Sequence, residues 1–213
     1  MGIDTIPVTL ERLEAARQYP ILKIKVGLPG DVETVKAIRE RTDAILRVDA
    51  NCGWSVDEAI ERINALEAYN IELIEQPIPA KNYEGLRKIR ENVNVPIMAD
   101  EDAITSADLP ALIGCVDAIN IKLMKCRGLR EARRMIDTAH AFGLKVMLGC
   151  MSESSLAITA AAHLSPLLDY ADLDAHLLIS NDPFEGVTVQ EGKLMLPDRP
   201  GIGAVAIGNG QVS

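Results

Sequence analysis

Short apolar runs rich in β-branched residues recur along the chain, each beginning roughly 25 residues after the last. The seven clearest runs cover residues 22–26, 45–48, 71–74, 96–99, 118–121, 145–148 and 170–173. Between them, apolar residues are spaced three or four apart, as in Ala59, Ile63 and Leu66, which is the pattern of an amphipathic helix. Ser55 and Glu58 have the spacing of a capping box at the start of that helix. The pattern predicts a strand followed by a helix, repeated along the chain.

Strict alternation of strands and helices predicts parallel strands with helices covering their outer face. A clipped strand near residues 1–5 and a helix near residues 9–19 would bring the count to eight units. We therefore predict a (β/α)8 TIM-type barrel whose first strand is clipped, forming one domain over residues 1–213. An open doubly wound sheet is the alternative, but no G-x-G-x-x-G pattern follows a strand. Residues 181–213 are expected to be free of helix.

Composition narrows the class of partner. The chain has 213 residues, 48% of them hydrophobic, and a net charge of −9, so a nucleic acid or an anionic membrane is a poor partner and a small molecule is favoured. Its four cysteines form no C-x-x-C pair, which indicates reduced thiols. We find no signal peptide and no apolar run of membrane-spanning length, and we therefore expect a cytoplasmic protein.

Acidic residues stand at the ends of three consecutive predicted strands: Asp49, Glu75 and Asp100. Any one of them could cap the helix that follows. In a barrel, however, the carboxyl ends of the strands form the active-site face, where three converging carboxylates would repel one another unless a cation lay between them. Oxygen ligands with no histidine or cysteine favour a hard ion such as Mg²⁺.

Two lysines, Lys23 and Lys25, are two residues apart on one predicted strand, so both side chains face the same side of it. A solvated edge strand would explain them, but a central barrel strand has no solvated face. Lysines crowded inside a barrel would lower each other's pKa, which suits a base. Lys122 ends the sixth predicted strand, across the expected barrel from Lys25.

These motifs together resemble the enolase superfamily, in its muconate lactonizing enzyme subgroup. The resemblance rests on Lys23-Ile24-Lys25, Asp49-Ala50-Asn51, Glu75-Gln76-Pro77, Ala99-Asp100-Glu101 and the segment from Asn120 to Lys125. Within that subgroup Asp172-Leu173-Asp174 resembles the Asp-x-Asp motif of dipeptide epimerases of the L-Ala-D/L-Glu type, and the segment 149–154 resembles their seventh-strand region. Asp102 and Arg127 depart from the family pattern, in which Ser or Thr and Gly are more usual.

The resemblance implies a Mg²⁺-dependent isomerase that removes and returns the proton alpha to a dipeptide carboxylate. It implies Asp49, Glu75 and Asp100 as metal ligands and Lys25 and Lys122 as the acid/base pair. Lys23 and Glu101 would support them, Lys23 by lowering the pKa of Lys25. Asp172 and Asp174 would bind the substrate ammonium group, and Asn51 and Met151 would contribute to the substrate site.

Other readings remain open at this point. A cycloisomerase or an o-succinylbenzoate synthase of the same superfamily uses the same lysines, but its substrate offers no ammonium group to the Asp-x-Asp pair. A catalytically silent truncated barrel is the third possibility. Members of the family also carry an N-terminal capping domain, which we expect this chain to lack, so the activity of the chain by itself is in question. We expect a homo-oligomer.

Overall fold

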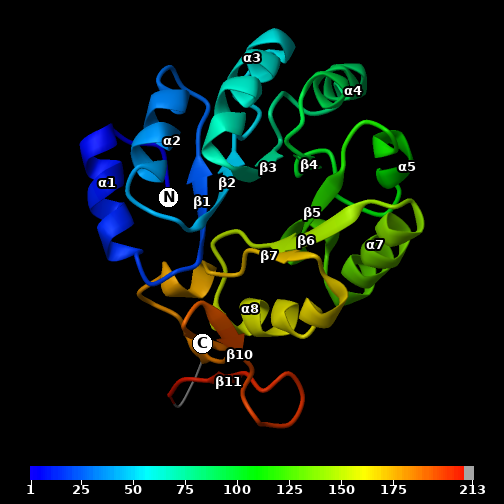
Figure 1. Cartoon of the computed structure of the whole chain (residues 1–213). Helices are drawn as coiled ribbons and strands as arrows, with labels where there is room; N and C mark the ends of the chain where they lie inside the picture. Colours follow the sequence, from blue (N-terminus) through cyan, green and yellow to red (C-terminus); the bar gives the residue numbers. More distant parts are fainter. Residues whose placement is uncertain (209–213) are drawn as a thin grey trace. The chain divides into compact units, whose positions relative to one another are not determined.

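The computed structural model describes residues 1–208, and the chain divides into two compact units (Figure 1). Unit 1 comprises residues 1–102 and 110–118, and unit 2 comprises residues 103–109 and 119 onward. Whether the two units make one domain, as the sequence predicts, stays a prediction.

Unit 1 repeats the predicted strand-then-helix order. Its strands are β1 (Ile21–Lys25), β2 (Ile45–Asp49), β3 (Ile71–Glu75) and β4 (Ile97–Ala99). Its helices are α1 (Ile6–Ala15), α2 (Asp31–Arg39), α3 (Val56–Leu66), the 3₁₀ turn η1 (Glu67–Tyr69), α4 (Tyr83–Asn92) and most of α5 (Leu109–Leu112). All four strands were predicted, with boundaries that differ by at most one residue.

The four strands pair in chain order, each parallel to the next. Their register places Lys25 opposite Asp49, and Asp49 opposite Glu75, at the carboxyl ends of β1, β2 and β3. Glu75 in turn faces Met98, so Asp100 follows one position beyond the end of β4. Strand register therefore brings the predicted site residues of this unit together at the carboxyl ends of its strands.

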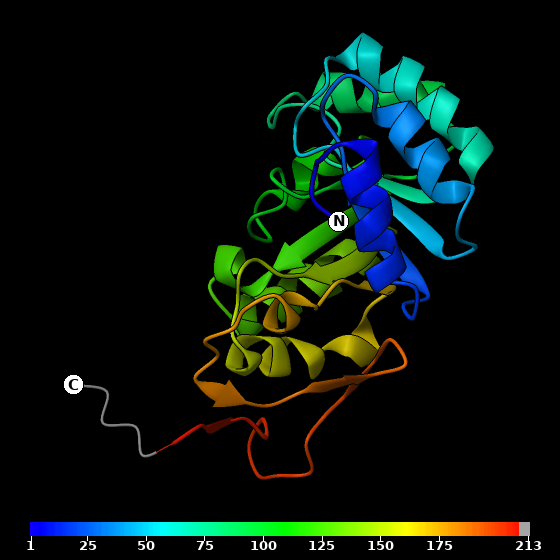
Figure 2. The ribbon, with the colours of Figure 1, turned by 90° about the vertical axis from the view of Figure 1, so that its left-hand side faces the viewer.

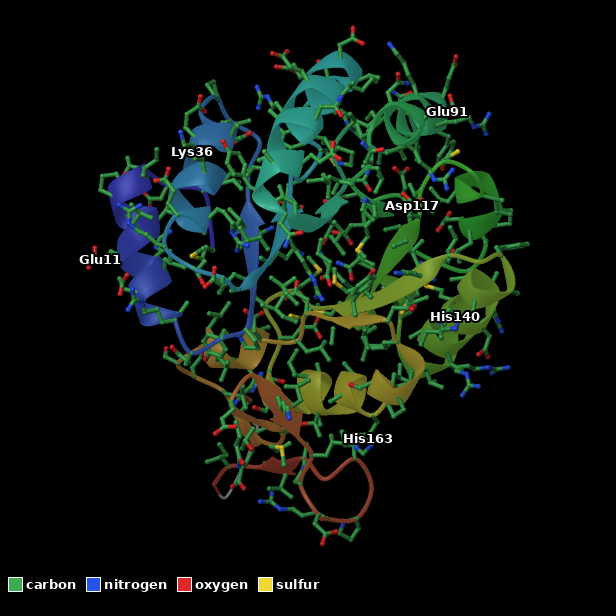
Figure 3. The ribbon with its side chains drawn as sticks, viewed as in Figure 1. Glu11, Lys36, Glu91, Asp117, His140 and His163 are labelled. Atoms are coloured by element: carbon green, nitrogen blue, oxygen red, sulfur yellow. The ribbon has the colours of Figure 1, made fainter. Side chains whose placement is uncertain are left out.

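The helices of unit 1 lie side by side along the strands, α1 next to α2, α2 next to α3 and α3 next to α4 (Figures 1 and 2). Each buries the apolar stripe that its spacing predicts: Val35 and Ile38 in α2, and Ala59, Ile63 and Leu66 in α3, are fully buried. Charged residues cover the opposite faces, as Figure 3 shows for the exposed side chains of Glu11, Lys36 and Glu91. Burial of such aliphatic side chains contributes about 1.5–3 kcal/mol each.

Unit 2 continues the strand-then-helix order and ends in short antiparallel strands. It holds β5 (Ala118–Lys122, except for its first residue), α6 (Leu123–Cys126), α7 (Leu129–Ala141), β6 (Lys145–Gly149), α8 (Ser155–Ala162), η2 (Ser165–Leu167), β7 (Tyr170–Ala171) and η3 (Ala175–Leu177). Strands β5, β6 and β7 follow one another in the sheet, and β6 and β7 are parallel. Two small antiparallel pairs complete it: β8 (Phe184–Glu185) with β11 (Val205–Ala206), and β9 (Thr188–Gln190) with β10 (Lys193–Met195).

Two details at the ends of the chain bear on the sequence predictions. The clipped strand expected near residues 1–5 is not formed as a strand, although the backbone of Met1 bonds to Lys23 and Lys25 on β1. The first helix begins at Ile6, earlier than predicted, because Pro7 suits the first turn of a helix. The stretch 181–208 contains no α-helix, as expected, and the remainder of that segment lies outside the described residues.

None of the helices that the structure describes is long and apolar enough to cross a membrane. The four cysteines are free thiols, as their spacing predicts.

Candidate active site

A row of charged side chains crosses the carboxyl ends of β1, β2 and β3. Lys25, Asp49 and Glu75 are register partners, so their Cα atoms lie side by side and their side chains leave the same face of the sheet. Asp49 and Glu75 are fully buried, whereas the side chain of Lys25 is 46% exposed. The row therefore presents a reachable amine beside two carboxylates removed from water.

Lys23 balances the charge of those carboxylates. Its ammonium nitrogen lies 2.8 Å from Oε2 of Glu75 and 3.2 Å from Oδ2 of Asp49, and its side chain is only 16% exposed. Buried carboxylates need such a cation, since desolvation disfavours their charged form. The predicted role of Lys23 as a neighbour that lowers the pKa of Lys25 stays a prediction.

Burial raises the pKa of Glu75 to about 7. The Lys23 ammonium opposes that rise, and the negative charges of Asp49 and Asp100 add to it. The three carboxylates singled out by sequence thus act on one another electrostatically, as groups that converge on one place must. Glu75 has a carboxyl group that a further cation would hold in its charged form.

Asp100 is held in place by Gln76, a residue that the sequence prediction did not assign a role. Oε1 of Gln76 accepts from the backbone N–H of Asp100 at 2.9 Å, and Nε2 donates to Asp102 Oδ2 at 2.8 Å and to the Ile78 carbonyl at 3.0 Å. Asp102 is buried and also accepts from the N–H of Lys81. Gln76 therefore fixes the segment after β4 to the end of β3. Asp102, where the family that the sequence resembles more usually has Ser or Thr, is part of that link.

Asn51 orients the amine of Lys25. The Lys25 Nζ donates to Asn51 Oδ1 at 2.6 Å and to Asp49 Oδ2 at 3.3 Å. Asn51 and Cys52 both have positive φ angles, a conformation that asparagine tolerates better than most residues. The backbone N–H of Asn51 also donates to Asp49 Oδ1, so the turn and the strand end form one hydrogen-bonded unit.

Glu101 lies close to this turn. Burial raises the pKa of the Cys52 thiol to about 11, and the negative charge of Glu101 adds to that rise before those of Asp102 and Asp100. The thiol next to Asn51 is therefore protonated at neutral pH. Among the neighbouring charges, that of Glu101, to which the resemblance assigns a supporting role, has the largest effect on this pKa.

The donor set of the row matches a hard divalent cation. Asp49, Glu75 and Asp100 offer oxygen atoms only, which suits Mg²⁺ and disfavours zinc or copper. Across residues 1–208, however, no group of three or more His, Cys, Asp or Glu side chains is arranged so that it could hold a metal ion directly. Coordination by these three carboxylates thus stays a prediction, supported by the type of ligand and by their mutual electrostatic effect.

The other predicted site residues lie in unit 2. Lys122 ends β5 and is half-buried, and Met151 follows β6 and is 50% exposed. Asp172 and Asp174 follow β7, at the carboxyl end of the strand as predicted. Each of these residues is thus near the end of its own strand, where a barrel carries its chemistry.

Cys150 connects the Asp-x-Asp segment to β6. Its thiol donates to the Asp172 carbonyl at 3.1 Å and lies 3.8 Å from Asp174 Oδ1. Burial raises the pKa of this thiol to about 12, and the charge of Asp172 adds to the rise, so the thiol stays a donor at neutral pH. Its position directly after an apolar strand, within the segment 149–154 that resembles the dipeptide epimerases, was the sequence signal that could have identified it.

The comparisons with known proteins agree with one another. A family model described as "Enolase C-terminal domain-like" matches residues 8–206. The L-Ala-D/L-Glu epimerase of Bacteroides thetaiotaomicron is 46% identical over 209 residues, which are 97% of this chain and 55% of that protein. The chain therefore spans about half the length of this curated relative.

Two solved structures are similar over nearly the whole chain. A dipeptide epimerase from Cytophaga hutchinsonii, complexed with Mg and the dipeptide D-Ala-L-Val, has a TM-score of 0.91 at 36% identity, covering 97% of this chain and 60% of that one. The L-Ala-D/L-Glu epimerase from Bacillus subtilis, in a substrate-liganded complex, has a TM-score of 0.90 at 34% identity, covering 96% and 61%. The predicted fold class, a TIM-type barrel, is confirmed by this likeness.

Proposed function

Since the chain belongs to the Enolase C-terminal domain-like family, we propose that it is the barrel part of a Mg²⁺-dependent dipeptide epimerase. The reaction inverts the carbon next to the dipeptide carboxylate by removing its proton and returning one to the other side. The observation that carries the proposal is the row formed by Lys25, Asp49 and Glu75, in which an accessible amine stands beside buried carboxylates. The relatives named above support the choice of a dipeptide.

Asp49, Glu75 and Asp100 would hold the metal ion. Bound there, Mg²⁺ supplies positive charge that stabilises the negative charge developing on the substrate carboxylate as the proton leaves. The protein's own contribution is to hold these carboxylates out of water beside Lys23, whose ammonium group offsets part of the repulsion between Asp49 and Glu75 and favours the charged form of Glu75.

Lys25 and Lys122 are assigned the two proton transfers. The neutral amine of one lysine takes the α-proton of one epimer as the C–H bond breaks. The ammonium group of the other lysine gives a proton to the same carbon, which leaves the opposite configuration. Asn51, which accepts from Lys25 Nζ at 2.6 Å, orients that amine. Glu101 has a supporting role beside the turn that carries Asn51.

Asp172 and Asp174 are assigned to the free ammonium group of the dipeptide, which requires anionic acceptors. Cys150 would help to fix both, since its thiol contacts each of them. Met151, half exposed after β6, would contact the substrate side chain. An L-Ala-Glu-like dipeptide is our first choice of substrate, and assembly into a homo-oligomer stays a prediction.

The proton transfers are tested by exchange in deuterated water. We expect that Lys25→Ala and Lys122→Ala both lose epimerisation, while each retains exchange of the α-proton for only one epimer. Exchange into a set of L,L- and L,D-dipeptides can be followed by NMR. Lys145→Ala, which removes a lysine from the amino-terminal end of β6, is the matched control and should behave as the native chain does. Epimerisation at the native rate in both site variants would contradict the assignment.

The substrate class is tested with blocked dipeptides. Loss of a charge-assisted hydrogen bond should cost on the order of 1.5–3 kcal/mol in kcat/KM, so N-acetylation of the dipeptide and Asp172→Asn or Asp174→Asn should each weaken turnover to that extent. Acetylation should then have little further effect on the variants. If acetylated and free dipeptides reacted equally well with the native chain, the assignment of the Asp-x-Asp pair would be wrong and cycloisomerase chemistry would be favoured.

A further inference from the structure

A buried carboxylate outside the candidate site connects the two loops that leave β1 and β2. Asp31, the first residue of α2, is only 6% exposed. An acidic residue in the first turn of a helix usually faces solvent and interacts with the helix dipole. The side chain of Asp31 instead turns back toward the loop after β1, where Oδ2 accepts from the N–H of Gly27 at 3.0 Å and Oδ1 from that of Leu28 at 3.2 Å.

The same carboxylate binds the loop after β2 and the helix that follows it. Oδ2 of Asp31 also accepts from Nε1 of Trp54 at 3.0 Å and from Nη1 of Arg62, on α3, at 2.8 Å. Arg62 in addition donates to the Leu28 carbonyl at 3.1 Å and lies over the Trp54 ring, 5.6 Å from its centroid. Trp54 is 2% exposed. Trp54 and Arg62 thus donate to the same buried carboxylate oxygen of Asp31. We call these three residues the loop clamp.

The two loops that the clamp joins are in backbone contact. A Cβ atom on Gly53 would lie 2.7 Å from the Cα of Gly27 and 2.8 Å from the carbonyl oxygen of Ala50, which is closer than real Cβ contacts allow. Gly27 has a φ of +132°, a conformation that favours glycine. Only glycine at both positions lets the loops approach this closely, and that approach brings Trp54 Nε1 within reach of Asp31.

Each loop begins at a residue of the candidate site. Lys25 precedes Gly27 by two residues, and the N–H of Val26 donates to the Asp49 carbonyl at 2.9 Å. Asp49 and Asn51, which contact Lys25 Nζ, precede Gly53 and Trp54 in the second loop. A shift of one loop relative to the other would therefore change the distance between the Lys25 amine and its two oxygen partners.

We propose that the loop clamp is a positioning device that sets the geometry between Lys25 and the pair Asp49 and Asn51. The inference rests on the proposed function for its catalytic consequence, but its structural consequence is independent of it. Within residues 1–208, the side-chain hydrogen bonds of Asp31, Trp54 and Arg62 involve none of the predicted lysines or metal ligands, so the clamp acts through the loops that carry those residues. Misplacement of a catalytic group by about 1 Å can cost on the order of 100-fold in rate.

The test compares Asp31→Asn with a matched control, Asp117→Asn. Asp117 also accepts from an arginine, Arg90, at 2.7 Å and from a backbone N–H, that of Ile97 at the amino-terminal end of β4, at 2.9 Å, but it lies directly before β5, away from the carboxyl ends of the strands. Both variants remove a carboxylate charge from an arginine and from a backbone N–H, although Asp31 also accepts from a second backbone N–H and from the Trp54 indole. A purely structural role predicts a loss of stability in both variants, with no selective change at the candidate site.

The first readout needs no catalysis. In Asp31→Asn we expect faster hydrogen exchange at the amides of Gly27 and Leu28 and at the Trp54 indole, together with several-fold weaker Mg²⁺ affinity in calorimetric titration. Asp117→Asn should leave these amides and the Mg²⁺ affinity unchanged. Unchanged exchange and unchanged Mg²⁺ affinity in Asp31→Asn would overturn the proposal.

The second readout is the division between kcat and KM for a dipeptide. We expect kcat to fall about 10- to 100-fold in Asp31→Asn with KM changed by less than threefold, and no such fall in Asp117→Asn. If Asp31→Asn does not fold, Arg62→Met and Trp54→Phe keep the carboxylate and should show smaller losses of the same kind. Arg62→Lys should retain more kcat than Arg62→Met, because it keeps a cation near Asp31.

The two proposals fail in different ways. If the native chain supplied with a capping domain exchanges no dipeptide α-proton, the proposed function is wrong, and hydrogen exchange at Gly27, Leu28 and the Trp54 indole still decides whether the clamp positions the loops. If the native chain is active and the loss of kcat in Asp31→Asn merely equals that in Asp117→Asn, the proposed function stands and the clamp is only structural.

Discussion

Glu75 is the predicted metal ligand whose ionisation the fold alters most clearly. It is fully buried, and burial raises its pKa to about 7, while Lys23 holds it at 2.8 Å. A neutral amide of the same shape removes both the charge and the repulsion with Asp49 and Asp100. We therefore expect Glu75→Gln to fold as well as the native chain, or better, and to lose Mg²⁺ binding.

Calorimetric titration with Mg²⁺ measures this loss directly. Asp57→Asn, which removes an exposed carboxylate on α3, is the control and should bind Mg²⁺ as the native chain does. An unchanged Mg²⁺ affinity in Glu75→Gln would show that this carboxylate is not a ligand.

His176 makes the stability of the chain depend on pH. Its ring nitrogens are buried, and among residues 1–208 neither has a hydrogen-bond partner; burial lowers its pKa, against the opposing charges of Asp182 and Asp174. A base whose pKa is lowered by folding stabilises the folded state above its unfolded pKa of about 6.5 and loses that contribution as pH falls.

Relative to the native chain, we expect His176→Leu to lose one contribution that lowers the free energy of unfolding as pH falls from 7.5 to 5, while the raised pKa of Glu75 acts in the opposite direction in both proteins. Denaturant unfolding at a series of pH values gives the slope of this free energy against pH. His163→Gln, at an exposed histidine on the C-terminal side of α8, should keep it. An identical slope in His176→Leu and the native chain would assign the pH dependence to other groups.

Sequence reasoning located residues by their place at strand ends and missed those that act through side-chain hydrogen bonds. Lys25, Asp49 and Glu75 were found because each ends an apolar run, and strand register alone then aligns them. Gln76 and Asp31 were missed, since the first follows a stronger motif and the second resembles an ordinary first-turn acid. Their partners are remote in sequence, Asp102 for Gln76 and Trp54 for Asp31, and only the fold brings them together.

At the scale of the element, local signals decided which predictions succeeded. The capping box at the start of α3 is formed as predicted: Glu58 N–H donates to Ser55 Oγ at 3.3 Å, and the Ser55 N–H donates to the Glu58 carboxylate at 2.9 Å. The hairpin of β9 and β10 was not predicted, because its strands have only three residues each. Its turn, Glu191-Gly192, has two consecutive positive φ angles, and the alternation around it was the available signal.

The capping box gives an element-scale prediction. Ser55→Ala should destabilise the folded state by about 0.5–2 kcal/mol, because it leaves an N–H of the first turn of α3 without its acceptor. Ser154→Ala is a matched control: Ser154 is the N-cap of α8, but its side chain makes no capping hydrogen bond. Chemical denaturation of both variants would measure the difference, and equal losses would mean that the capping bond contributes nothing.

At the scale of the whole molecule, metal binding at the candidate site and the stability of the folded chain are linked. An ion that binds the folded chain and not the unfolded chain stabilises it by mass action, by about 2.7 kcal/mol at a free concentration 100 times its dissociation constant. We therefore expect the Tm of the native chain to rise by several degrees as Mg²⁺ is added and to return to its starting value with a chelator. Differential scanning calorimetry on Glu75→Gln should show no rise; a rise equal to that of the native chain would place the ion elsewhere.

The order of strands and helices over the whole chain was predictable because the spacing of apolar residues and the local composition repeat in every strand–helix pair. Which side chains meet inside each compact unit has no comparable sequence signal, since it depends on segments far apart in the chain. Net charge is a whole-molecule property of another kind: at −9 it disfavours polyanionic partners whatever the fold.

Trp54 is the only tryptophan among the 213 residues, and it is 2% exposed. Fluorescence excited in the indole absorption band of this chain therefore comes from one buried side chain. The Nε1 of that side chain donates to Asp31, which follows the loop that begins at Lys25. Its fluorescence spectrum should be shifted toward the blue, as it is for an indole screened from water. The chain thus contains its own optical probe beside the candidate site, and a change in emission on adding a metal ion or a dipeptide could be followed without any attached dye.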